Sequence, residues 1–279
     1  MRFALAVALL TSPALAEVPR VMTDIPPVQA LVAQVMGGLG TPGMLLDKGG
    51  DEHELRLRPS QMRDLGASGL VVWVGHELTP GLADALAASG VTTLALLEQP
   101  ATRRIDYAGG GVNPHAWLDP VNAKLWSGLI AEKLAALDPK NAATYRANAA
   151  GALVGLDALD RQIAADLAPV ADRPFLGWHD AYAYFAAHYQ LTYLGGLSEG
   201  DEAPPGAARL SAVAALVAKG SIACAFPEAQ HDPAMVAALG PVKLGMALDP
   251  VGSMQDPGPD AYAKLMQALA AALTDCLAP

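Results

Sequence analysis

The sequence predicts an α/β protein of two lobes, each a mainly parallel sheet flanked by helices, joined by a long spine helix. Three observations lead to this fold class. Short apolar runs alternate with helix-like segments in the first half of the chain, the alternation resumes in the second half, and an unbroken helical pattern separates the two. Alternating strands and helices form parallel sheets. With 279 residues and 52% hydrophobic side chains, the chain can build either one large α/β domain or two domains of ordinary size.

The first half contains a strand–helix–strand unit. Residues 69–75 read Gly-Leu-Val-Val-Trp-Val-Gly, a continuous apolar run typical of a strand that is buried on both faces. Thr79-Pro80 then places a cap residue before a proline at the first helical position, and Gly90 ends that helix. The next strand is expected over residues 91–97. This order predicts a parallel sheet in the first lobe.

Two further cap-and-proline pairs begin consecutive helices, at Asp119-Pro120 and Asp138-Pro139. The second helix meets no breaker before Pro169, so we expect it over residues 138–168. Its apolar stripe steps by three and four residues along one face and consists of Leu153, Leu156, Leu159, Ile163 and Leu167. At 1.5 Å per residue its length of roughly 45 Å exceeds the width of one domain. We therefore expect this helix to be a spine that joins an N-terminal lobe, residues 17–137, to a C-terminal lobe, residues 169–279.

Strands and helices also alternate after the spine. The strands are expected at residues 174–178, 191–197, 222–226 and 242–248. The helices are expected to begin at Asp180, near Pro205, at Asp232-Pro233 and near Pro259.

Residues 1–16 are typical of a secretory signal peptide, with Arg2 before an apolar stretch and a small-x-small cleavage site that ends at Ala16. We therefore expect export to the periplasm. No later stretch reaches the roughly 18 unbroken apolar residues that a membrane-spanning helix needs. Removal of the signal takes away Arg2 and no acid, so 17 basic and 28 acidic side chains leave a net charge of −11. This charge argues against nucleic acid as a partner and is typical of a soluble surface.

Three histidines and one aspartate stand in short polar motifs, about one structural unit apart: His53, His115, His179 and Asp249. Imidazole nitrogens and one carboxylate suit zinc and related divalent cations. His179 and Asp249 directly follow predicted strands, at the sheet edge where α/β proteins bind ligands. His115 lies just before the helix start at Asp119, and His53 lies before Ser60, a potential helix cap. Because two candidates precede the spine and two follow it, a site that uses all four must lie between the lobes.

Five segments, in the same order along nearly the whole mature chain, resemble the ZnuA family of periplasmic zinc-binding proteins of ABC uptake transporters. They are Gly-Asp-Glu-His-Glu-Leu-Arg-Leu-Arg-Pro-Ser from Gly50, Asn-Pro-His-Ala-Trp-Leu-Asp-Pro from Asn113, Asp-Pro-Lys-Asn-Ala-Ala-Thr-Tyr from Asp138, His-Asp-Ala-Tyr-Ala-Tyr-Phe from His179, and Phe-Pro-Glu-Ala-Gln from Phe226. The resemblance implies two lobes joined by a rigid helix, with metal bound in the cleft between them.

By motif, the resemblance implies that His53, His115 and His179 are the three zinc-binding histidines. Asp249 falls on the carboxylate position after the last strand, and Glu52 on a neighbouring acid that completes or shields the site in some members. The fourth ligand can thus be Asp249, Glu52 or water.

The remaining histidines and Glu228 lack such a ligand motif. His188 and His231 are expected to be structural, and His76 follows a strand from which it can approach the cleft. Glu228 is expected to be a structural group or a support for the ligands.

The two cysteines of the chain fit an oxidising compartment, where they can form one disulfide. Cys224 and Cys276 also fall where some zinc-binding members carry a disulfide. Residues 99–112 depart from the family pattern, because many members carry a long His-rich loop there and this segment is short and contains no histidine.

The function implied is a high-affinity zinc-binding protein that delivers Zn²⁺, its transported ligand, to a membrane permease. The expected protein is a monomer without enzymatic activity, and a periplasmic metallochaperone is a further candidate partner. One alternative is a manganese- or iron-binding member, although three imidazoles favour zinc. A second alternative is a secreted zinc hydrolase. The chain lacks a His-Glu-x-x-His motif and an evident general base, which argues against this alternative. A third is an adhesin-like surface protein, which often carries a lipobox cysteine that is absent near Ala16.

Overall fold

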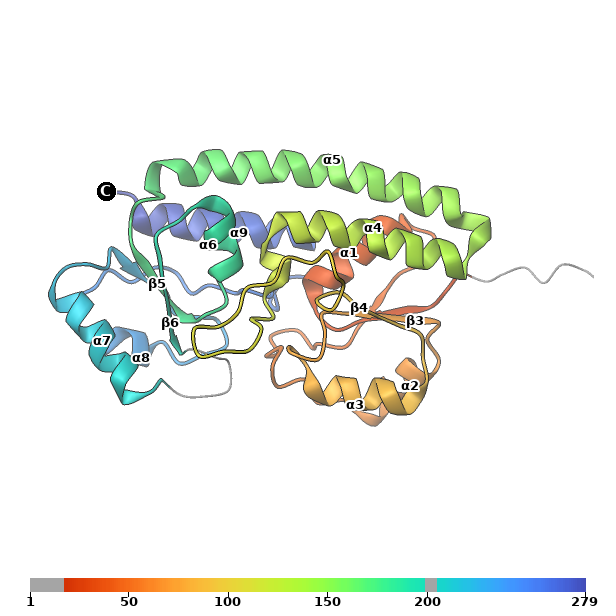
Figure 1. Cartoon of the computed structure of the whole chain (residues 1–279), viewed down its shortest axis with the longest axis horizontal. Coiled ribbons are helices and arrows are strands. Elements are labelled where there is room, and N and C mark those ends of the chain that lie inside the picture. Colours follow the sequence, from red (N-terminus) through yellow and green to blue (C-terminus); the bar gives the residue numbers. More distant parts are fainter. Residues whose placement is uncertain (1–17, 199–204) are drawn as a thin grey trace, which may run out of the picture.

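The computed structural model describes residues 18–198 and 205–279, and the predicted signal peptide, residues 1–16, lies outside the described residues. In the described part, two parallel sheets lie side by side beneath one long helix (Figure 1). This arrangement confirms the predicted fold class. No helix in these ranges has the length and apolar character needed to cross a membrane.

The N-terminal sheet has the strand order β2-β1-β3-β4, and all its pairs are parallel. Its strands are β1 (Val21–Thr23), β2 (Gly43–Met44), β3 (Leu70–Trp73) and β4 (Thr93–Ala95). The helices that accompany it are α1 (Pro26–Met36), α2 (Pro59–Gly66) and α3 (Pro80–Ser89). All four residues of β3 are buried, as the apolar run predicts, and Gly90 ends α3 with a positive φ of 66°. Helix α2 begins one residue before the expected cap Ser60, with Arg58 at the cap position.

The C-terminal sheet has the order β6-β5-β7 and is also parallel. Its strands are β5 (Phe175–His179), β6 (Tyr193–Ser198) and β7 (Cys224–Ala225), and its helices are α6 (Ala183–Tyr189), α7 (Ala207–Ala218) and α8 (Ala234–Ala237). The predicted strand at residues 242–248 forms only two isolated bridges to the neighbouring segment. It lies at the sheet edge with Leu244 and Met246 exposed, so its apolar residues are not those of a strand buried on both faces.

The predicted spine is α5 (Ala142–Leu167), with short 3-10 turns at Pro139–Asn141 and Ala168–Val170. Its 26 residues give a length of about 39 Å. It packs against α1, α4 (Pro120–Leu137) and α9 (Ala261–Leu277), so helices from both ends of the chain lie along it (Figure 1). One cluster of buried apolar side chains extends from Val21 to Leu277 through both halves. The lobe boundaries at residues 137 and 169 stay predictions.

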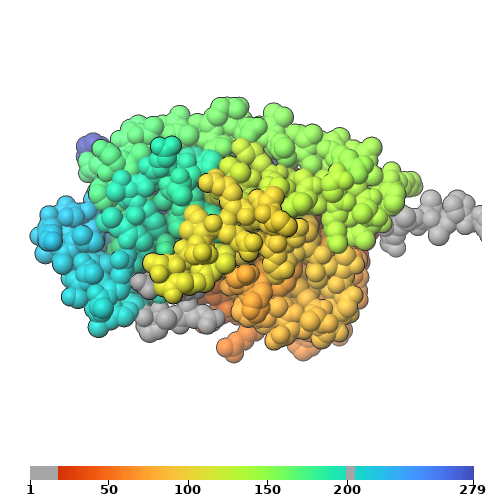
Figure 2. Space-filling model, viewed as in Figure 1, coloured from red at the N-terminus to blue at the C-terminus, as the bar shows by residue number. Residues whose placement is uncertain are grey.

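Two further contacts join segments that are distant in the sequence. A disulfide between Cys224 and Cys276 joins β7 to α9 and confirms the predicted pairing. The segment of residues 99–112 lies against α6, where the Tyr184 hydroxyl accepts a hydrogen bond from the Ile105 backbone at 2.8 Å. The same hydroxyl donates to the Asn113 carbonyl at 2.8 Å. Figure 2 shows this contact as yellow atoms against teal ones.

Candidate metal centre

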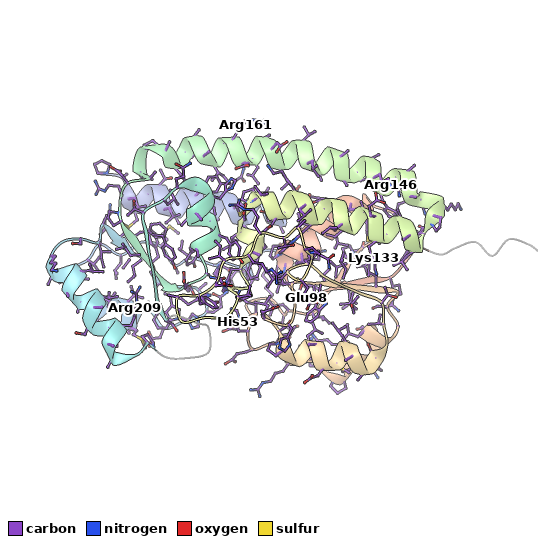
Figure 3. The ribbon with its side chains drawn as sticks, viewed as in Figure 1. His53, Glu98, Lys133, Arg146, Arg161 and Arg209 are labelled. Carbon is purple, nitrogen blue, oxygen red and sulfur yellow. A yellow bond between two sulfur atoms is a disulfide. The ribbon has the colours of Figure 1, made fainter. Side chains whose placement is uncertain are left out.

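Four side chains from three segments meet between the two sheets: Glu52, His53, His115 and His179. His53 and Glu52 lie on the irregular segment between β2 and α2, His115 directly precedes the 3-10 turn Ala116–Leu118, and His179 ends β5. One possible ligand atom from each side chain lies within 4.8 Å of the others. Figure 3 shows His53 near the middle of the long axis. The structure thus brings together ligand candidates from both halves of the chain.

Asn113 holds the imidazole of His115 in one orientation. Its side-chain oxygen accepts hydrogen bonds from the His115 backbone N–H at 3.0 Å and from the ring Nδ1 at 2.8 Å. Its side-chain nitrogen donates to the Asp180 carbonyl at 2.6 Å, which excludes the flipped amide. Because Nδ1 of His115 carries the proton, Nε2 presents a lone pair to the centre.

Glu228 holds His179 in the same way. Its Oε2 lies 2.6 Å from Nδ1 of His179, and its Oε1 accepts a hydrogen bond from the Tyr182 hydroxyl at 2.9 Å. A carboxylate on Nδ1 fixes the tautomer of a ligand histidine and makes Nε2 a stronger donor to a metal ion. Glu228 and His179 are both buried, so little water competes for this contact.

The Nε2 atoms of His115 and His179 lie 3.0 Å apart. Since each ring uses Nδ1 as its donor, two lone pairs face each other, and they repel unless a proton or a metal ion lies between them. Two nitrogens bound to one tetrahedral zinc at roughly 2.0–2.1 Å are about 3.3 Å apart. The observed spacing is therefore within a few tenths of an ångström of the spacing that a zinc ion requires.

His53 and Glu52 complete the group. The His53 ring lies 5.3 Å from that of His115 and 5.8 Å from that of His179, measured between centroids. The Glu52 Oε1 lies 3.8 Å from the His53 Nε2. Burial raises the pKa of Glu52 to about 8, an effect that His179 partly offsets. A divalent cation between these side chains would replace the proton on Glu52 and favour the carboxylate.

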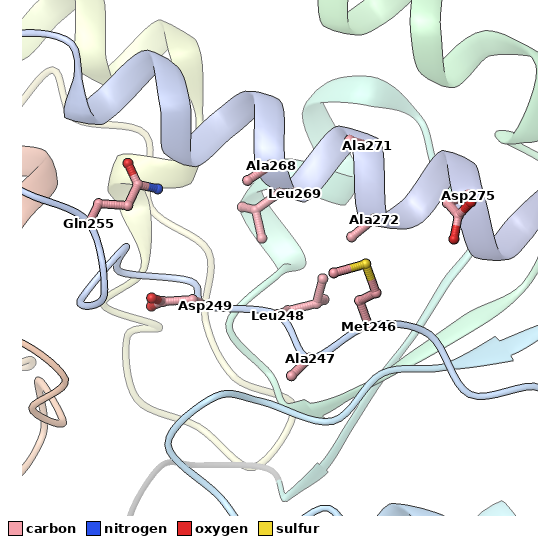
Figure 4. Close-up of a pocket in the computed structure, with 10 residues that line it drawn as sticks. All are labelled: Met246, Ala247, Leu248, Asp249, Gln255, Ala268, Leu269, Ala271, Ala272 and Asp275. Atoms are coloured by element: carbon pink, nitrogen blue, oxygen red, sulfur yellow. The ribbon is translucent and has the colours of Figure 1, made fainter.

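Asp249 lies outside this group of four. Its Oδ1 accepts hydrogen bonds from the Gly252 and Ser253 backbone and from the Gln230 side chain, at 2.8–3.1 Å. Its Oδ2 accepts from the Met254 backbone at 3.2 Å. Figure 4 shows Asp249 on the segment that runs beside α9. The carboxylate closes a turn, a role that is common for aspartate in an Asp-Pro pair. The role of Asp249 as a ligand stays a prediction.

A family model described as zinc-uptake complex component A, periplasmic (ZnuA), matches residues 21–276. The chain belongs to the ZnuA family. It is 44% identical to the high-affinity zinc uptake system protein ZnuA of Paracoccus denitrificans, over 95% of this chain and 94% of that protein. It is 31% identical to the protein of the same name from Brucella abortus, over 92% and 91% of the two chains. The family resemblance found in the motifs is thereby confirmed.

Solved structures support the fold of this ZnuA-family chain. A crystal structure of ZnuA aligns with a TM-score of 0.81 at 22% identity, covering 93% of this chain and 99% of the other. The periplasmic zinc-binding protein TroA from Treponema pallidum aligns with a TM-score of 0.84 at 22% identity, covering 94% and 99%. At this level of identity the likeness concerns the fold.

The other predicted residues of this ZnuA-family chain lie around the centre or away from it. His76 is exposed after β3 and outside the group of four. His188 lies between Asp119 and Asp160, with its Nε2 2.7 Å from the Asp160 carboxylate. Glu228, expected as a structural or supporting group, contacts His179.

Sequence reasoning missed Asn113 and Tyr182 as supporting groups. The position of Asn113, two residues before His115 in the Asn-Pro-His motif, was the signal that could have identified it. Tyr182 follows His179 by three residues, but its contact with Glu228 depends on how β5 and β7 pair.

Proposed function

We propose that this chain binds one Zn²⁺ through the Nε2 atoms of His53, His115 and His179 and the carboxylate of Glu52, and delivers it to a membrane permease. The observation that carries this proposal is the pair of Nε2 atoms 3.0 Å apart, with each Nδ1 engaged by a neighbouring oxygen. Such a pair needs a proton or a metal ion between its lone pairs, and the spacing is close to that of two nitrogens on one zinc ion. Family membership and the names of the relatives agree with uptake of zinc.

The ligand set favours zinc over manganese or iron. Three imidazoles and one carboxylate match the nitrogen-rich, four-coordinate sites that zinc prefers, whereas manganese prefers more oxygen ligands. Glu52 supplies the one negative charge, and its burial keeps competing water away. Glu52 rather than Asp249 is the fourth ligand, because the Asp249 carboxylate already accepts several hydrogen bonds in its turn.

Release of zinc requires a limited motion. His115 and His179 are held by Asn113 and Glu228, whereas His53 and Glu52 lie on residues 45–58, which form neither helix nor strand. The long helix α5 packs along both halves and resists their wide separation. Movement of residues 45–58 would take two of the four ligands away and leave two in place.

The partners follow from this role. The chain acts in the periplasm as a monomer. It takes up the ion from solution or from a periplasmic metallochaperone and passes it to the permease of an ABC transporter. The chain performs no bond chemistry in this role. In a zinc hydrolase, by contrast, one coordination position must hold reacting water, and in the proposed ligand set Glu52 takes that position.

Calorimetric titration of the chelator-stripped mature protein with Zn²⁺, and separately with Mn²⁺, tests the proposal. We expect tight one-to-one zinc binding that His179→Ala abolishes, weak manganese binding, and unchanged zinc binding in the exposed control His76→Gln. Zinc binding that is indifferent to His179 would overturn the assignment of the site. Hydrolysis of a chromogenic ester that depends on His115 would support the hydrolase instead.

A further inference from the structure

A second group of potential ligands lies on the other side of the His179 ring. It consists of His179, Glu228 and His231, each with one possible ligand atom within 4.8 Å of the others. Nε2 of His179 faces His115, whereas its Nδ1 faces Oε2 of Glu228 at 2.6 Å. Nε2 of His231 lies 3.7 Å from the same oxygen. The two groups therefore meet at one imidazole, on the sides of its opposite nitrogens.

His231 is the most exposed side chain of the two groups. The His231 side chain is 28% exposed, whereas that of Glu228 is 1% and that of His179 is 5% exposed. A small cavity of about 10 Å³ is lined by Glu52 and His53 of the inner group together with the residues of the outer group. This volume is about that of one water-sized sphere. The partly exposed His231 thus borders a cavity that also reaches side chains of the proposed zinc site.

The ring of His231 is held in place rather than loosely exposed. It stacks on Trp178 with the centroids 5.0 Å apart and an angle of 23° between the planes. Its centroid lies 6.3 Å from that of His179. A phenylalanine at position 231 could stack on Trp178 equally well, so the stacking alone does not explain why Nε2 of His231 lies near Glu228. The position of Nε2 beside the carboxylate is thus a separate feature, which points to a cation.

We propose that His231 and Glu228 form an outer site for a divalent cation, through which Zn²⁺ passes on its way into and out of the inner site. The inference rests on the proposed function. Nε2 of His231 and Oε2 of Glu228 bind the partly hydrated ion, and water fills its other positions. A carboxylate oxygen has two lone pairs, so Oε2 accepts the Nδ1 proton of His179 and still faces the ion. With two protein ligands against four, the outer site is the weaker one, and the ion moves inward.

An intermediate site on the path changes the rates of binding and release by the same factor and leaves their ratio, the Kd, unchanged. The test variant is His231→Phe, which keeps a ring to stack on Trp178 and removes both nitrogens. The control is His76→Gln, a histidine change at an exposed position away from both groups. Zinc association and release are followed by stopped-flow competition with a fluorescent chelator.

We expect His231→Phe to lower both rate constants by about tenfold while the Kd stays within about twofold, and His76→Gln to match the wild type. Unchanged rates in His231→Phe would overturn the outer site. A weaker Kd at an unchanged association rate would also overturn it, because His231 would then only support the inner site. If the wild type binds zinc at no site that depends on His179, the proposed function itself fails.

A second measurement needs no variant. With the inner site filled by Zn²⁺, one equivalent of paramagnetic Co²⁺ is added and the histidine ring signals are followed by NMR. We expect the signals of His231 to broaden before those of His76. Equal broadening of the two would contradict a built outer site.

Discussion

The contact between Glu228 and His179 can be tested by Glu228→Gln, which keeps the size of the side chain and removes its charge. The carboxylate lies 2.6 Å from Nδ1 of His179, and both groups are buried. A hydrogen bond to a charged partner contributes about 1.5–3 kcal/mol, and loss of such a support for a ligand histidine lowers metal affinity about 10- to 100-fold. The two figures agree, since tenfold corresponds to about 1.4 kcal/mol.

The expected result is a zinc Kd about 10- to 100-fold higher in Glu228→Gln, measured by chelator competition at pH 7.5. The matched control is Glu132→Gln, which breaks the exposed pair with Arg146. Arg146 lies toward one end of α5 in Figure 3, away from His53. The control should leave both the Kd and the stability unchanged, because an exposed ion pair contributes little to either. A Kd for Glu228→Gln within twofold of the wild type would refute the view that Glu228 orients His179.

Three further predictions concern the fourth ligand, protons and stability. Glu52→Gln should weaken zinc binding more than Asp249→Asn does. Asp249→Asn should instead lower the melting temperature, because it loosens the turn that Asp249 closes. A larger Kd in Asp249→Asn than in Glu52→Gln would make Asp249 the ligand. Zinc affinity should fall as the pH drops below about 8, because the raised pKa of Glu52 lets a proton compete with the metal. In Glu52→Gln this fall should begin at a lower pH than in the wild type, and a wild-type Kd that is constant from pH 8 to 6 would contradict the prediction. Asp119 and Asp160 raise the pKa of His188, so its protonated form stabilises the fold fully below pH 6.5 and this contribution is lost as the pH rises through the raised pKa. His188→Gln should therefore lower the free energy of unfolding at pH 6 and approach the wild type at pH 9 in urea titrations; an equal loss at both would exclude an ionic role.

The elements with strong local signals were predicted well. Helix α3 lies between Thr79 and Gly90 as expected, because a cap, a proline and a glycine each restrict the backbone locally. Strands β1 and β2 were missed, since three and two residues are too short to show a periodicity. The prediction of a strand at residues 242–248 was wrong, because an apolar segment at an exposed sheet edge cannot be told from a buried strand by its amino-acid composition.

The sequence by itself determined the fold class, the family and the three candidate ligand histidines, because each depends on local motifs and on their order along the chain. Only the tertiary structure decided which carboxylate lies beside those histidines. Glu52 and Asp249 both adjoin candidate motifs, but one side chain is buried in the group while the other closes a turn. The supports of the site also come from packing, since Glu228 lies 49 residues from His179 and meets it only where β7 pairs with β5. Hydrogen-bond partners that distant depend on how whole segments pack, which no local pattern specifies.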